Sequence, residues 1–298
     1  MMHLQLSCPT ASAKLQLPLK KLKNPPFAVL ALSKKAERFL SSLASSDGDS
    51  NRLINKFVMS SPKSLSLEIL SHLLSPQISH HFVHYAFPVY LNIVDTSWYD
   101  WNPKLVAQMA ALLRSQGKTV DSETLILDAL HHRKSERDLC LFFCELLNSH
   151  AIYGSSDGFE EVYSRIGKLA EESGSVYVKR QFRKAIVKGL CMMGKPAEAE
   201  RLLEGKGTVF EHRCILEGYG KMGLNSEMER VLNLMTSKDT VAFNMVIRCS
   251  GVGEMATQVR RMKEAGVPMT LRTCNSVLNR CATLMRMVTE AEGLASAE

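Results

Sequence analysis

The sequence predicts an all-α fold, an α-solenoid built from antiparallel helical hairpins. Two similar hexapeptides, at residues 239–244 (DTVAFN) and 270–275 (TLRTCN), lie 31 residues apart, and a weaker copy at 208–213 (TVFEHR) lies 31 residues earlier. A fixed period in this range is typical of stacked helical pairs. No segment alternates between polar and apolar residues for long enough to indicate a sheet.

Residues 1–45 are expected to form a disordered leader. The first 36 residues hold six lysines and no acidic residue, and they show no periodic apolar face. Such a composition suits an organelle transit peptide, and the absence of arginine favours the chloroplast over the mitochondrion. The alternative is a basic tail on a cytosolic protein.

Residues 46–100 are predicted to form an atypical helical N-terminal cap. Pro62 stands where a helix would begin, and Pro88 implies a kinked helix or two short helices within 80–94. An aromatic cluster, Trp98-Tyr99-Asp100-Trp101, closes this segment. It reads either as a stacking platform for a base or as packing that joins the cap to the first repeat.

Residues 101–298 are predicted to form the helical repeats. Pro103 and Pro196 suit first helical positions, and glycines follow the apolar runs where helices end. The last unit is expected to hold a first helix and part of a second. One equivalent first-helix position recurs in six units: Ala107, Cys144, Lys184, Arg213, Asn244 and Asn275.

Four segments read as parts of a helical repeat. They are 239–244 (DTVAFN), like a junction between repeats; 215–223 (ILEGYGKMG), like a first helix and turn; 194–203 (GKPAEAERLL), like a turn and second helix; and 262–268 (MKEAGVP), like a repeat end. Together these segments resemble plant pentatricopeptide repeat (PPR) proteins. The resemblance covers residues 178–298 well and 100–177 loosely, whereas the period of 34 residues and the opening motif of a tetratricopeptide repeat are absent.

The resemblance implies that one first-helix residue and one residue at the end of the same repeat contact a base of single-stranded RNA, whose unstacked bases expose their edges. Lys184 and Arg213 suit phosphate better than a base edge, and Arg213 has Asp239 as an alternative ion-pair partner. Asn244 and Asn275 have the alternative role of helix caps. The predicted RNA-binding residues are Lys184 with Thr208, Arg213 with Asp239, Asn244 with Thr270, Asn275 alone, and Val241, which would pack against bases.

Charge is concentrated rather than spread. The net charge is +7, of which residues 1–36 carry +6 and residues 174–197 another +6, so the rest is acidic or neutral. Within the second segment the cations recur four residues apart, as on one helical face. A polyanion would be drawn to this basic strip, and a solvated face is the alternative. Its predicted phosphate-contacting residues are Lys179, Arg180, Arg183 and Lys188, next to Lys184 and Lys195.

Motifs for other functions are absent from the sequence. His80, His81 and His84 do not form the His-Glu-x-x-His pattern, and no metal site is predicted. Nothing in the sequence matches a phosphate-binding loop, a dinucleotide fingerprint, a hydrolase elbow or a nucleotide deaminase motif. We therefore expect no enzyme activity, no cofactor and no small-molecule substrate. The eight cysteines form no Cys-x2-Cys pair and suit buried thiols. No apolar run reaches the roughly 18 residues of a membrane span.

The sequence as a whole favours a PPR-type solenoid that binds single-stranded organellar RNA without catalysis. The resemblance implies assistance to intron splicing or to RNA stabilisation and processing. A second copy of the chain or a protein cofactor is the further partner to consider. The alternative is a helical-repeat scaffold that binds protein, which the near-neutral charge outside the leader supports.

Overall fold

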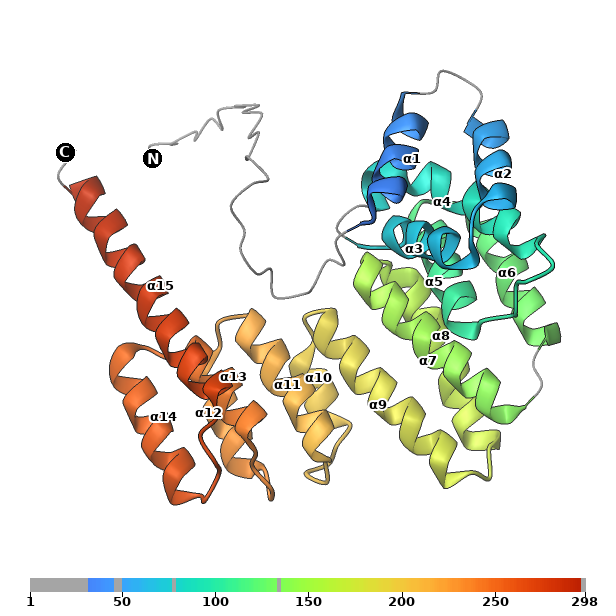
Figure 1. Cartoon of the computed structure of the whole chain (residues 1–298). Helices are drawn as coiled ribbons and strands as arrows, with labels where there is room; N and C mark the ends of the chain where they lie inside the picture. The colour runs from blue at the N-terminus through green and yellow to red at the C-terminus, as the bar shows by residue number, and fades with distance from the viewer. Residues whose placement is uncertain (1–31, 46–49, 77–78, 133–134, 296–298) are drawn as a thin grey trace, which may run out of the picture. The chain divides into compact units, whose positions relative to one another are not determined.

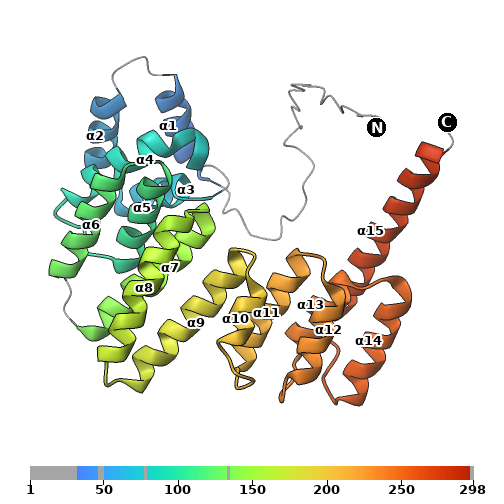
Figure 2. The same ribbon diagram turned by 180° about the vertical axis from the view of Figure 1, so that it is seen from behind.

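The computed structural model describes residues 32–45, 50–76, 79–132 and 135–295. All regular structure in these ranges is helical, which confirms the all-α prediction (Figures 1 and 2). The chain divides into two compact units, residues 1–50 and residues 51–298. In the described part of the chain, none of the helices has the length and apolarity to cross a membrane.

In the first unit, the described residues form helix α1 (Lys34–Ala44). Ser33 caps it by accepting a hydrogen bond from the amide of Ala36 at 3.3 Å, and its apolar residues recur at helical spacing. The prediction of a disordered leader as far as residue 45 was therefore wrong for this stretch. The amphipathic pattern of α1 is short and begins at two lysines, so it is a weak signal in the sequence. The transit-peptide prediction for residues 1–31 lies outside the described residues.

The predicted cap region contains α2 (Ser50–Ser60), α3 (Lys63–Leu73) and α4 (Ser79–Val94), of which α3 and α4 pack together. Pro88 lies inside α4, which stays one continuous helix rather than two. The side-chain amide of Asn92 donates to the carbonyl of Pro88 at 2.9 Å. Pro62 is the N-cap of α3.

From Pro103 onward the helices form antiparallel pairs, and the first helix of each pair also packs against the first helix of the next (Figure 1). This arrangement is the predicted solenoid of helical hairpins. The pairs are α5 (Pro103–Ser115) with α6 (Thr119–His132), α7 (Glu136–Tyr153) with α8 (Ser156–Glu172), α9 (Val176–Met192) with α10 (Pro196–Arg201), α11 (Val209–Lys221) with α12 (Asn225–Leu234), and α13 (Thr240–Cys249) with α14 (Val252–Glu264).

Left-handed glycines confirm the predicted register of the first helices. The first helices α5, α7, α9 and α11 are each followed by a glycine with φ between 70° and 76°, a conformation that only glycine adopts without strain. These glycines are Gly117, Gly154, Gly194 and Gly223, and each lies ten residues after the predicted equivalent position, namely Ala107, Cys144, Lys184 and Arg213. The equivalent positions therefore lie at a constant distance before the glycine that follows each first helix, although the spacing between the early repeats is irregular.

Helix α9 is longer than its successor, with 17 residues against 13 in α11. Because the two helices align at their C-terminal glycines, the surplus is about one turn at the N-terminus of α9. Residue 179 falls on that added turn, and residue 180 is equivalent to the first residue of α11. Near the other end, Gly189 lets α9 approach α8, since a β-carbon there would lie 2.6 Å from a ring carbon of Phe159.

The last unit differs from its prediction. Residues 271–295 form one continuous helix, α15 (Leu271–Ala295), which packs on α13 and α14. A first helix followed by part of a second was expected there. No glycine or proline interrupts the sequence between Leu271 and Glu292, so no local signal ends the helix at the usual place.

Candidate nucleic-acid interface

Helix α9 carries the basic strip. Lys179, Arg180 and Lys188 are exposed, and none of them has an ion pair or side-chain hydrogen bond to a residue that the structure describes. Arg180, Lys184 and Lys188 are four residues apart, so they follow one face of the helix. Repulsion between like charges at this spacing would be relieved by an anionic ligand. The free cations of the strip are therefore suited to phosphate groups.

Arg183, on the same helix, is already engaged. Its Nε and Nη2 donate to the two carboxylate oxygens of Glu211 in α11 at 2.8 and 3.2 Å. Glu211 is fully buried. Burial alone would raise the pKa of Glu211, but hydrogen bonds from Thr208 and from Arg183 outweigh it and hold the pKa below its usual value. The structure thus gives Arg183 a carboxylate partner within the fold, where the sequence predicted a phosphate contact.

Lys184 and Lys195 contact neighbouring helices. The Lys184 ammonium lies 5.8 Å from the centre of the Phe210 ring, within reach of a cation–π interaction. Lys195 pairs with Glu160 at 3.0 Å, and both side chains are largely exposed. Phe210 is itself 43% exposed at the start of α11. An accessible aromatic ring therefore lies beside the middle of the strip.

Thr208 is the N-cap of α11. Its hydroxyl accepts from the amide of Glu211 and donates to the Glu211 carboxylate, which also accepts from the amide of Thr208. This reciprocal arrangement is a capping box. The predicted role of Thr208 in base contact would require its hydroxyl to leave these partners.

Arg213 pairs with Asp239, as the alternative reading of the sequence expected. The Arg213 Nε donates to Asp239 Oδ1 at 3.2 Å, and the second carboxylate oxygen contacts Nη2. Asp239 Oδ1 also accepts from the amide of Ala242 and so caps α13. Both side chains are about one third exposed, so solvent weakens the pair. Of the three predicted residue pairs, this is the one that the described contacts join.

Asn244 lies five residues after the cap of α13 and is only 4% exposed. Neither its amide nitrogen nor its amide oxygen has a hydrogen-bond partner within the described structure. The predicted base contact of Asn244 would therefore require this side chain to become accessible. Its alternative role as a helix cap is wrong, because Asp239 holds that position. Val241, one turn earlier, is half-buried.

Thr270 precedes α15 and is paired locally. Its amide and hydroxyl contact the hydroxyl of Thr273, and the Thr273 amide donates back to the Thr270 hydroxyl. Asn275 is exposed and, within the described residues, has no side-chain hydrogen bond. Thr208, Asp239 and Thr270 thus begin three helices whose first residues lie 31 positions apart, as the repeated hexapeptides predicted.

Two residues that matter for this region were not predicted. Glu211 accepts hydrogen bonds from both Thr208 and Arg183. The Thr-x2-Glu spacing in the sequence is the signal that could have indicated its role in a capping box. Phe210 lies beside Lys184, and no sequence pattern indicates that contact.

Among the described residues, no group of three or more potential metal ligands converges, and all seven described cysteines are free.

The helix pairs, their register and the basic face of α9 define an all-α helical-hairpin repeat protein. No family model matches the sequence. In an alignment of 282 positions that covers 88% of the chain, the sequence is 43% identical to a pentatricopeptide repeat-containing protein of Arabidopsis thaliana. The chain is therefore homologous to a pentatricopeptide repeat protein, which confirms the resemblance seen in the sequence. It spans 56% of that relative's length.

Proposed function

We propose that this protein binds single-stranded RNA in the chloroplast and assists intron splicing or RNA stabilisation there. The observation that carries the proposal is the set of exposed cations on α9 that have no partner among the described residues, namely Lys179, Arg180 and Lys188. Arg180 and Lys188 follow one face of this helix together with Lys184, a residue at the predicted base-facing position. Homology to a PPR protein supports the choice of RNA as the ligand.

The geometry favours backbone contact over base reading in this region. Arg183 and Arg213 have carboxylate partners, and Thr208 and Thr270 have local hydroxyl or carboxylate partners. The exposed cations keep their full charge for phosphate, which fixes position without reading sequence. We therefore expect modest sequence selectivity, with Asn275 as the exposed polar residue left for a base.

The salt dependence of RNA affinity tests this proposal. Changing Lys179, Arg180 and Lys188 together to alanine removes three phosphate contacts, and each contact contributes about 0.7 to the slope of log affinity against log salt. The slope should therefore fall by about 2. A matched control replaces Lys206, Arg260 and Lys263, exposed cations outside the strip. Equal slopes in the two triple variants would overturn the assignment of the strip.

The second candidate is a helical-repeat scaffold for protein partners. The near-neutral charge outside the leader favours it. Failure of the unaltered protein to retain single-stranded RNA at low salt would favour the scaffold over the RNA-binding proposal.

Import of a fluorescent fusion into isolated chloroplasts tests the proposed location, and crosslinking to organellar RNA identifies the target.

A further inference from the structure

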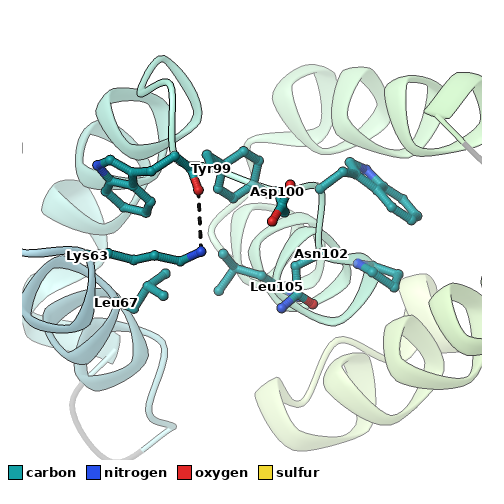
Figure 3. A pocket seen from close by; sticks show the side chains of 9 residues that line it. Lys63, Leu67, Tyr99, Asp100, Asn102 and Leu105 are labelled. Atoms are coloured by element: carbon teal, nitrogen blue, oxygen red, sulfur yellow. Dashed lines mark hydrogen bonds between the residues drawn. The ribbon is translucent and has the colours of Figure 1, made fainter.

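A pocket of about 400 Å³ lies between α3, the loop that follows α4, and the start of α5 (Figure 3). Its volume falls in the range of about 300–1,000 Å³ that small-molecule sites occupy. All of it belongs to the second unit of the chain. The lining residues come from α3 (Lys63, Leu67), from the loop (Trp98, Tyr99, Asp100, Trp101, Asn102) and from α5 (Pro103, Leu105).

Three of the nine lining residues are aromatic. Trp98, Tyr99 and Trp101 are each only partly buried, although side chains of this size are costly to leave in water. A flat ligand that stacks on these rings would match such a lining.

Two opposite charges face this space. Figure 3 shows the Lys63 ammonium and the Asp100 carboxylate extending toward it from α3 and from the loop. The ammonium is held in place, since it donates to the carbonyl of Trp98 at 3.3 Å and lies 5.7 Å from the centre of the Trp98 ring. Asp100 is exposed and accepts no hydrogen bond from a described residue. Its two oxygens are free for a ligand.

The charges select among flat ligands. A carboxylate needs two adjacent donors for a paired hydrogen bond. Guanine is the common base whose pairing edge places an N–H and an amino group side by side, whereas adenine, cytosine and uracil each place an acceptor beside their donor. The fixed ammonium suits a phosphate attached to the same ligand. Indole rings stack on any base.

From this arrangement we infer that the pocket binds a guanine nucleotide, with Asp100 on the base edge and Lys63 on the phosphate. The ligand chemistry is shared by a free guanosine monophosphate and by a guanosine of a single-stranded RNA. The inference goes beyond the proposed function, because the pocket uses none of the residues of the α9 strip.

The fluorescence of the protein's own tryptophans can report ligand binding in this pocket. It contains only two tryptophans, and both line the pocket. Tryptophan fluorescence of the full chain, excited at the red edge of the absorbance, therefore reports on this site. The four nucleoside 5′-monophosphates and guanosine are the probes. Guanosine monophosphate should quench the fluorescence saturably, with an affinity about ten-fold or more above that of the other three.

Substitutions at Asp100 and Lys63 test which part of the ligand each charged side chain contacts. Asp100→Asn should abolish the preference for guanine, and Lys63→Gln should make guanosine and its monophosphate bind equally, while Lys63→Arg keeps the difference. Asp95→Asn and Lys104→Gln are controls, since both residues are exposed nearby without lining the pocket. Circular dichroism shows that each variant is folded. No saturable quenching, equal affinity for all four nucleotides, or an unchanged preference in Asp100→Asn would each overturn the inference.

Oligonucleotides distinguish the two sources of the ligand. Competition by a short RNA with one terminal or internal guanosine, but not by the same RNA with adenosine there, places RNA in the pocket. Competition by the free nucleotide alone assigns the pocket to a mononucleotide. The salt-slope measurement on the α9 strip is separate, so the RNA-binding proposal and the pocket stand or fall independently.

Discussion

Arg183 of α9 and Glu211 of α11 are joined by two hydrogen bonds, of 2.8 and 3.2 Å, between consecutive first helices of the solenoid. The Glu211 side chain is fully buried, whereas that of Arg183 is 40% exposed. The carboxylate also receives the amide and hydroxyl of Thr208. One buried acid thus fixes the start of its own helix and the position of the preceding repeat.

We expect Arg183→Ala to destabilise the fold by about 1–3 kcal/mol, because it leaves a buried carboxylate with two fewer donors. Chemical denaturation measures this loss. Arg180→Ala is the matched control, since Arg180 is exposed one turn away and has no described partner. The control should lower the salt slope of RNA binding and leave stability within about 0.5 kcal/mol. A stable Arg183→Ala variant would contradict the pairing.

Replacement of Asn244 should raise stability. Its buried amide has no hydrogen-bond partner in the described structure, and burying an unpaired polar group costs about 1–3 kcal/mol. Asn244→Leu, of similar size, should therefore increase the free energy of unfolding by a similar amount. Asn275→Leu, at the equivalent but exposed position, should change it little. A fall in stability for Asn244→Leu would show that the amide is satisfied in solution.

The same Asn244→Leu variant bears on base contact. If Asn244 reads a base, the preference at one nucleotide of a bound RNA should relax while the salt slope stays unchanged, because phosphate contacts are untouched. Affinity measurements on oligonucleotides that differ at single positions would detect this. An unchanged preference at every position would limit Asn244 to a place in the core.

His150 should make stability depend on pH. It is fully buried in α7, and burial, with a smaller effect of Arg114, lowers its pKa to about 4. The unfolded chain binds a proton near pH 6.5, so the contribution of His150 is complete above that value. It declines by roughly 3 kcal/mol as the pH falls from 6.5 to 4. Denaturation curves at several pH values measure this slope, which should be smaller in His150→Leu.

Thiol reactivity should follow burial. Cys274 is exposed in α15, whereas Cys191 is buried in α9 and burial raises the pKa of its thiol to about 12. Because the thiolate is the reactive form, a maleimide should modify Cys274 long before Cys191 in the folded protein. Mass spectrometry of timed digests gives the order. Similar rates at both sites would indicate that α9 opens readily.

The sequence alone determined the repeat. Its hexapeptides marked the starts of α11, α13 and α15, and glycine after each apolar run marked the ends of α5, α9 and α11. These features are local, because capping and left-handed turns depend on residues a few positions apart. No such signal stands near residue 285, so the sequence does not predict the uninterrupted length of α15.

The tertiary structure decided which side chains remain free. Arg180 and Arg183 look alike in the sequence, yet the carboxylate of Glu211 lies 28 positions further along the chain and engages only Arg183. Asn244 and Asn275 occupy the same repeat position, but one is buried and the other exposed. Burial and pairing depend on how neighbouring helices stack, and a repeat pattern fixes the helices without fixing which of their polar groups meet.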